Sequence, residues 1–212
     1  VEATFIYGID ALKDTTSQPL VDGRVWVPEM EMDSLAGFLQ TKWVIHDDVI
    51  VKAGVRRESI DLSVDDYETL KLCRSETQCS VPLQVKGDTI DYDATTYNIA
   101  IKYNWSDSFS PFFNYSQGSD IADIGRLLRA ATVDDIGLIQ TEASIIDNYE
   151  VGFTSLFDQV RLEVAAYRST SELGTTNSFN EVTGVYEPVR APQEIWGYEG
   201  LVDYRISETL NV

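Results

Sequence analysis

The sequence is poor in the residues that carry most catalytic and metal-binding chemistry. Its 212 residues include one histidine and two cysteines. The histidine, His46, falls in a predicted tight turn, which leaves no basis for a Ser-His-Asp catalytic group. Glycine-rich phosphate loops, zinc-ligand spacing and calcium loops are also missing from the sequence. We therefore expect a protein that is not an enzyme, with no metal site and no cofactor of its own.

Basic residues and long apolar runs are scarce as well. The chain has 16 Lys and Arg against 35 Asp and Glu, a net charge of −19. Such a balance argues against a nucleic-acid partner, because phosphates need a basic surface. No run approaches the roughly 18 apolar residues of a membrane helix, and no signal peptide is visible at the start. We expect a mature protein or a piece of a longer one.

The two cysteines lie six positions apart in a polar segment. Cys73 and Cys79 flank the letters RSETQ. Nothing nearby offers histidine or further cysteine for a metal. The spacing predicts a local disulfide in an oxidising compartment, with two free thiols as the alternative.

The clearest pattern in the chain is an alternation of apolar and polar residues between Tyr92 and Gly118. It is typical of β-strands that have one apolar, aromatic face and one polar face. Ser106-Asp107-Ser108 supplies the chemistry of a turn between two such strands. One parity of the first strand holds Tyr97, Ile99, Ile101, Tyr103 and Trp105, and the other holds Asn98, Ala100, Lys102 and Asn104.

The same unit repeats along the chain and predicts about eight strands. Alternate connections in an up-and-down antiparallel sheet fall at opposite ends, so all the long loops are expected at one end. A short helix is expected within the third loop, over Ile124–Ala131. The predicted strands are Val1–Leu12, Ser34–Ile45, Val49–Val64 with a bulge near Arg57-Glu58, Tyr92–Trp105, Phe109–Gly118, Asp147–Leu156, Val160–Ser169 and Glu194–Ile206, and the long loops are Asp14–Glu31, Asp65–Asp91, Ser119–Ile146 and Thr170–Pro192.

Strand length and loop asymmetry indicate a membrane barrel. The predicted strands are about ten to fourteen residues long, whereas soluble strands average roughly five to six. Long loops on one side and tight turns on the other are typical of outer-membrane β-barrels. The fold class is therefore all-β, an antiparallel up-and-down meander forming part of a large transmembrane β-barrel. Charges fall on the polar parity of the strands: Lys42, Lys52, Arg56, Lys102, Arg161, Glu163, Glu199, Asp203 and Arg205.

Two alternatives share the alternating pattern. One is a soluble β-sandwich that serves as a binding module. The other is a small, complete eight-stranded outer-membrane barrel with a structural or adhesive role. That barrel requires a closing strand pair between Val1–Leu12 and Glu194–Ile206.

Several segments, in order, resemble the barrel of TonB-dependent siderophore receptors of Gram-negative outer membranes. The match includes a strand with Y-S-Q-G, a D-N-Y-E-x-G strand, and a strand with Y-x-S-x-S-x-L-G. One departure is Gly118-Ser119-Asp120, where the family usually has an aromatic residue after the glycine. The segments that carry the resemblance are Phe112–Ala131, Ile145–Phe153, Val164–Thr176 and Ile195–Ile206.

The resemblance implies a receptor that binds a ferric siderophore and imports it with energy supplied by the TonB complex. Family members have an N-terminal plug domain and a barrel of 22 strands. Residues 1–212 are therefore expected to be a partial barrel domain from the C-terminal half, without the plug, the early strands or the final strand. Outer-membrane lipid is an expected partner. Alone, such a piece would expose strand edges and could self-associate through them.

Recognition of an anionic or aromatic chelate calls for Arg, Tyr and Trp from the loops and the upper lumen. On this interpretation His46 lies in a periplasmic turn, far from that site. An ordinary loop or lumen ion pair is the alternative role for each candidate. By position, the candidate ligand-binding residues are Arg126, Arg129, Arg168, Tyr186 and Arg190.

Overall fold

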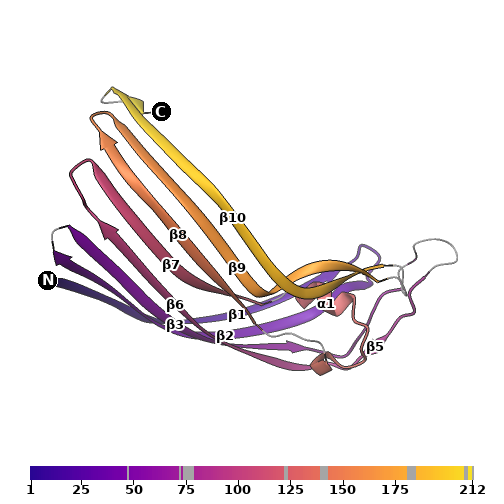
Figure 1. Cartoon of the computed structure of the whole chain (residues 1–212). Coiled ribbons are helices and arrows are strands. Elements are labelled where there is room, and N and C mark those ends of the chain that lie inside the picture. Colours follow the sequence, from indigo (N-terminus) through magenta and orange to yellow (C-terminus); the bar gives the residue numbers. More distant parts are fainter. Residues whose placement is uncertain are drawn as a thin grey trace.

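The computed structural model forms one curved, open β-sheet with two folded loops at one end (Figure 1). It describes residues 1–46, 48–71, 73, 79–121, 124–138, 143–180, 185–207 and 210–211. Nine strands follow one another in chain order across the sheet, and each pairs antiparallel with its neighbour. They are β1 (Glu2–Pro19), β2 (Val25–His46), β3 (Val49–Val64), β6 (Asp88–Tyr103), β7 (Phe109–Asp120), β8 (Ser144–Phe157), β9 (Val160–Asn180), β10 (Val185–Ser207) and the two-residue β11 (Leu210–Asn211).

The order confirms the predicted meander. Eight of the strands are 12 to 23 residues long, as a membrane barrel requires. Tight turns join β2 to β3, β6 to β7 and β8 to β9 at one end of the sheet, which we call the turn end (Figure 1). Neighbouring turns are joined there by backbone hydrogen bonds, such as Asn104 N to Asp48 O at 2.7 Å.

Two of the four predicted long loops are wrong in extent. β1 continues to Pro19 and β2 begins at Val25, so most of Asp14–Glu31 forms a hairpin. β9 and β10 likewise extend through most of Thr170–Pro192. Gly184 in that segment lies outside the described residues. The strands therefore run well past the length that spans a bilayer. The two middle loops, Asp65–Asp91 and Ser119–Ile146, keep the predicted form.

Those two loops fold against each other at the opposite end, the loop end. The β3–β6 loop carries β4 (Tyr67–Glu68) and β5 (Gln84–Val85), which pair with each other. The β7–β8 loop carries helix α1 (Ile124–Arg129), close to the predicted helix, and a 3₁₀ turn over Ile136–Leu138. Their buried side chains join three strand residues in one apolar cluster: Leu62, Val64, Val85, Tyr92, Ile124, Leu128 and Ile136.

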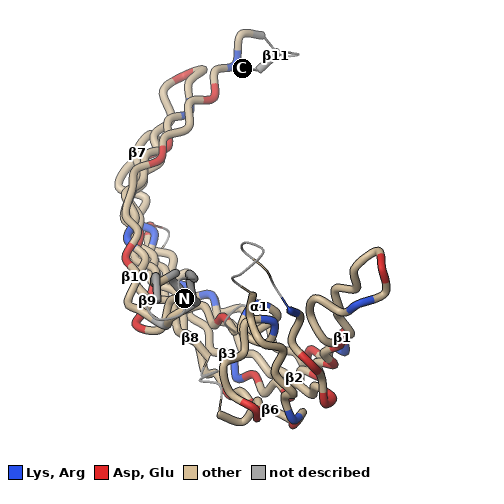
Figure 2. The backbone as a smooth tube through the Cα atoms, turned by 90° about the vertical axis from the view of Figure 1, so that its right-hand side faces the viewer, with Lys and Arg blue, Asp and Glu red and all other residues tan. Residues whose placement is uncertain are grey.

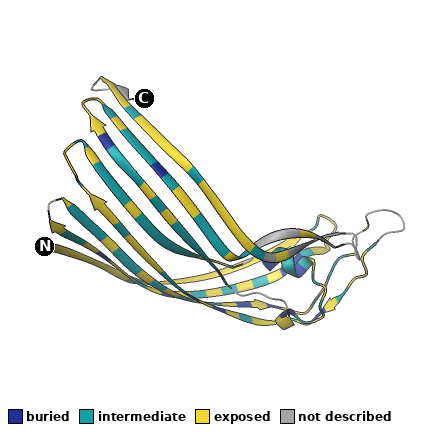
Figure 3. Ribbon diagram, in the orientation of Figure 1, coloured by how far each residue is buried: buried dark blue, intermediate teal, exposed yellow. Residues whose placement is uncertain are grey.

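This cluster identifies the two faces of the sheet. Figure 2 shows the sheet curving around α1, so the face that carries the cluster is concave. Residues opposite one another in the register share a face, and the alternation along each strand separates the two faces. The other face is convex and apolar; Tyr7 is 80% exposed and Tyr198 77% exposed there. Figure 3 accordingly shows much of the sheet exposed or half-buried.

The predicted bulge near Arg57-Glu58 is wrong. β3 pairs with β2 and with β6 in unbroken register through these residues. The apolar parity switches because the surroundings change. Near the turn end the apolar side chains of β3 face outward, and beyond Glu58 they face inward, where Leu62 and Val64 pack beneath the two loops.

The architecture bears on both alternatives. A β-sandwich needs a second sheet facing the first across a core; within the described ranges the second sheet is the two-residue pair β4–β5. The closing pair of a small complete barrel is not formed either, because β1 pairs with β2 while β10 pairs with β9 and β11 in the part of the chain that the structure describes. Among the described residues no helix is long and apolar enough to span a membrane.

Candidate functional site on the concave face

The concave face gathers the strand charges that the alternation predicted. Arg56 and Lys102 share it through the register with Phe38 and with Phe112. On β9 and β10, Arg161 lies opposite Asp203 on the same face. The remaining charges with this parity are Lys42, Lys52, Glu163, Glu199 and Arg205.

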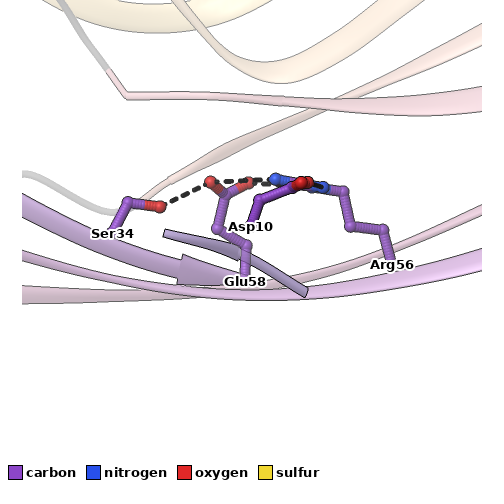
Figure 4. A network of polar contacts seen from close by, with 4 residues as sticks. All are labelled: Asp10, Ser34, Arg56 and Glu58. Atoms are coloured by element: carbon purple, nitrogen blue, oxygen red, sulfur yellow. Dashed lines mark hydrogen bonds and ion pairs between the residues drawn. The ribbon is translucent and has the colours of Figure 1, made fainter. Parts of the chain in front are cut away.

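A polar network crosses β1, β2 and β3 on this face (Figure 4). Arg56 lies 2.5 Å from Asp10 Oδ2 and donates from Nε to Glu58 Oε2 at 3.3 Å. Ser34 Oγ donates to the second Glu58 oxygen at 2.8 Å. Glu58 and Arg56 are two apart on one strand and therefore project to the same side. Each charge of the network thus has a partner, and the three strands are held together by side chains as well as by the ladder.

Helix α1 brings Arg126 and Arg129 over the concave face at the loop end. Arg129 lies over the ring of Trp26, with its guanidinium carbon 5.5 Å from the ring centroid, a cation–π contact. Both arginines are half-buried and lie in the last turn of the helix. The structure thus puts these two candidates in one place, at the mouth of the concave space.

Arg168 requires a correction. It lies opposite Tyr149 on one side and Trp196 on the other, and both belong to the convex face. Its Nε and Nη2 donate to Glu194 at 3.0 and 3.1 Å in a bidentate pair. The prediction placed Arg168 at the top of its strand, but β9 continues to Asn180, and strand parity assigns the Arg168 side chain to the outside.

Tyr186 and Arg190 have backbones in β10, opposite Phe179 and Thr175. Their side chains lie outside the described residues. Their role in ligand binding stays a prediction.

The loop end is held together by specific contacts. Tyr67 donates its hydroxyl to the carbonyl of Leu128 in α1 at 2.8 Å, linking the two loops. Burial raises the pKa of Tyr67 to about 12.

Within the β3–β6 loop, Cys73 and Cys79 are joined by a disulfide, as the spacing predicted. Asp66 accepts from the backbone N–H of Gly87 at 2.7 Å, across the base of the same loop.

The Asp10–Ser34–Arg56–Glu58 network was not predicted as a unit. The alternation predicted that Arg56 lies on the polar face of its strand. It did not single out Asp10 or Ser34 as residues that would contact Arg56 or Glu58. Register across three strands brings them together, and sequence spacing alone does not give register.

In the described part of the chain no group of three or more His, Cys, Asp and Glu could hold a metal ion.

Comparison with known proteins agrees with this geometry. A family model described as "TonB dependent receptor-like, beta-barrel" matches residues 3–212. The chain belongs to this family. The resemblance found in the sequence motifs is thereby confirmed, and the family is one of receptors and transporters.

Curated relatives of this TonB-dependent receptor barrel are distant but cover most of it. The chain is 24% identical over 204 residues to the ferric aerobactin receptor of Klebsiella pneumoniae, covering 86% of this chain and 26% of that protein. It is 21% identical over 202 residues to the rhizobactin receptor of Rhizobium meliloti, covering 87% and 26%. The chain therefore spans about a quarter of the length of these relatives.

Solved structures show the same fold. The copper transporter OprC superposes with a TM-score of 0.73 at 10% identity, over 98% of this chain and 34% of that one. The ferric yersiniabactin uptake receptor FyuA of Yersinia pestis gives 0.66 at 14% identity, over 97% and 30%. The curved sheet is thus similar to a segment of these larger barrels, with its convex face outward and its concave face toward the lumen.

Proposed function

We propose that this chain is part of the barrel wall of an outer-membrane receptor that binds a ferric siderophore and imports it with energy from the TonB complex. The observation that carries the proposal is the family match over residues 3–212. The names of the curated relatives, receptors for ferric aerobactin and rhizobactin, support the siderophore class. The same family membership supports a location in the outer membrane of a Gram-negative bacterium, which is part of this proposal.

The structure supports different roles for the two faces of the sheet. The apolar convex face suits contact with lipid, because every second strand residue of a membrane barrel meets the bilayer. The concave face carries the charges and is the wall of the lumen. At the loop end, α1 brings Arg126 and Arg129 over this lumen, and we propose these two as ligand contacts, together with Tyr186 and Arg190. Arg168 is not included, because it lies on the convex face.

Uptake in cells tests this function. A strain that lacks the receptor, complemented with the whole gene, is supplied with radiolabelled ferric siderophores under iron limitation. We expect uptake that requires both the receptor and TonB. Replacing Arg126 and Arg129 by Gln is expected to lower binding of the accepted siderophore about tenfold or more, since charge-assisted hydrogen bonds contribute roughly 1.5–3 kcal/mol each. Uptake that persists without TonB would contradict the proposal.

The matched control is Arg57→Gln. Arg57 lies on the convex face of β3 and pairs with Asp93 at 2.9 Å. The variant removes one arginine charge without touching the proposed contacts, so binding is expected to stay unchanged.

A further inference from the structure

Helix α1, which carries Arg126 and Arg129, is too short to determine its own position. It has six residues, and isolated helices shorter than about 12 residues are marginal in water. Its apolar side chains, Ile124 and Leu128, are buried in the apolar cluster at the loop end. The position of Arg129 therefore depends on the segments that contact the last turn of this helix.

Tyr67 holds the last turn of α1 from the β3–β6 loop. Its hydroxyl donates to the carbonyl of Leu128 at 2.8 Å, and that carbonyl belongs to the peptide group that joins Leu128 to Arg129. The side chain of Tyr67 is half-buried and packs against the apolar cluster. The backbone at Arg129 is thus fixed by a side chain from another loop.

Trp26 holds the guanidinium of Arg129 from the β1–β2 hairpin. Trp26 is the second residue of β2, and its ring centroid lies 5.5 Å from the guanidinium carbon. Tryptophan is the aromatic side chain that attracts a cation most strongly. The backbone and the charged group of Arg129 are therefore held by two different segments, both outside the β7–β8 loop that carries the arginine.

The surroundings of Trp26 indicate that this position uses the ring and not the N–H group. The Nε1 atom of Trp26 is buried and has no hydrogen-bond partner among the described residues. Atoms of this chain already enclose Nε1, so a further part of the receptor does not reach it. A buried donor without a partner lowers stability, and Phe or Leu would bring no such donor. What a Trp ring adds here is its contact with the cation of Arg129.

An aromatic ring holds a cation without cancelling its charge. The ion-paired arginines of the chain are held by carboxylates instead, as Arg168 is held by Glu194. Such a pair is neutral as a whole and attracts a further anion only weakly. Trp26 is uncharged, so Arg129 keeps its positive charge while it is held in one place. A guanidinium presents several N–H donors that match the geometry of an oxyanion.

We propose that Trp26 and Tyr67 are positioning residues for Arg129, which they hold at the mouth of the concave space as a contact for an anionic group of the imported chelate, a carboxylate or another oxyanion. The inference rests on the proposed function, in which Arg129 is a ligand contact. It adds that a hairpin and a second loop, both outside the β7–β8 loop, set the position of this contact before a chelate binds.

Arginine footprinting of the whole receptor, purified in detergent, tests the positioning without a ligand. Phenylglyoxal modifies accessible guanidinium groups, and mass spectrometry reads the rate at Arg129 relative to Arg57 on the convex face. We expect Trp26→Leu to raise this relative rate about three- to tenfold, and Tyr67→Phe to raise it about two- to threefold. Trp26→Phe keeps a ring and is expected to restore most of the protection. The matched control, Trp43→Leu, removes the tryptophan of the same strand near the turn end and should leave the rate unchanged.

A binding measurement connects the position of Arg129 to the chelate. The probe is the radiolabelled ferric siderophore that the uptake assay selects from hydroxamate, catecholate and carboxylate siderophores. Trp26→Leu is expected to weaken its binding about three- to tenfold in the native receptor, and to have no further effect in the Arg129→Gln background. Trp26→Phe is expected to bind nearly as the native receptor does. Heat-modifiability on gels checks that each variant keeps its fold.

Three results would overturn the proposal. One is a modification rate of Arg129 that Trp26→Leu leaves unchanged. Another is a loss of binding that Trp26→Leu causes equally in the Arg129→Gln background, because Trp26 would then act independently of the arginine. The third is a Trp26→Phe variant that behaves like Trp26→Leu. Uptake that persists without TonB, together with the expected footprint at Arg129, would contradict the proposed function and leave the positioning of Arg129 standing.

Discussion

Aromatic rings of the concave face lie over glycines of the neighbouring strand. The ring of Phe112 covers Gly152, its direct partner across β7 and β8. A ring over a strand glycine shields backbone that has no side chain of its own. Two further direct pairs repeat the arrangement: Gly8 with Phe38, and Gly197 with Tyr167.

Gly152→Ala tests this packing. An added Cβ would press first on the backbone carbonyl oxygen of Val164, and it would lie 2.6 Å from Phe112 Cζ and 3.0 Å from the Cα of Ala165. We expect a loss of about 1–3 kcal/mol in stability, the usual cost of overpacking. Gly37→Ala is the matched control, because a Cβ there would meet no described atom within 4 Å. Urea-unfolding midpoints of the two variants should differ, and equal midpoints would contradict the packing.

Tyr67 gives a prediction about pH. Burial raises its pKa from 10.0 to about 12, so the folded loop end disfavours the ionised form. Below pH 10.0 both folded and unfolded states are protonated, and the contribution of Tyr67 is fully present. As the pH rises from 10.0 toward about 12, the unfolded state ionises first and the loop end loses stability.

Tyrosinate absorbance, compared between the native receptor and Tyr67→Phe, checks this. The difference spectrum should show one hydroxyl titrating near pH 12 rather than near 10. The same variant loses the hydrogen bond to Leu128, and at neutral pH we expect the loop end to lose about 1 kcal/mol and to be cut faster by proteases. A difference titration near pH 10 with unchanged proteolysis would contradict the burial of this hydroxyl.

At the scale of the element, strand parity was predictable and strand ends were not. Where a strand crosses lipid, one face must be apolar, so the alternation in β6 or β10 is clear in the sequence. Past the bilayer both faces meet water, and the alternation disappears although the ladder continues. Asp14–Glu31 and Thr170–Pro192 were therefore interpreted as loops. Proline added to the error: Pro19 ends β1, and Pro28 lies in β2 just where the register with β1 shifts.

The folded loops give a prediction at this scale. The Cys73–Cys79 disulfide closes a short segment within the β3–β6 loop. Replacing both cysteines by Ser is expected to cost about 2 kcal/mol of local stability through the entropy of the open segment. Because the crosslink lies outside the strands, hydrogen exchange should rise in this loop and stay unchanged in β3 and β6. Faster exchange along the strands themselves would show that the loop supports the sheet.

At the scale of the whole molecule, two chemically different faces explain the fold. Toward the turn end the convex face is apolar, its ion pairs such as Arg57–Asp93 and Arg168–Glu194 lie nearer the loop end, and the concave face carries charges along the strands. One curved sheet with these faces is what a barrel wall requires. The alternation of apolar and polar residues was enough to predict this. Parity alone assigns Arg168 to the convex face, whereas the Arg56 network could not be predicted, because it depends on the register between strands.

The most direct test of the central claim is nitroxide scanning along β6 in the receptor reconstituted in lipid, in a background without Cys73 and Cys79. Labels are placed one at a time at residues 97 to 102. Labels at Tyr97, Ile99 and Ile101 are predicted to be accessible to oxygen dissolved in the bilayer. Labels at Asn98, Ala100 and Lys102 are predicted to be accessible to a water-soluble nickel complex. Equal accessibility at both parities, or the opposite phase, would contradict a lipid-facing convex surface and a lumenal concave one.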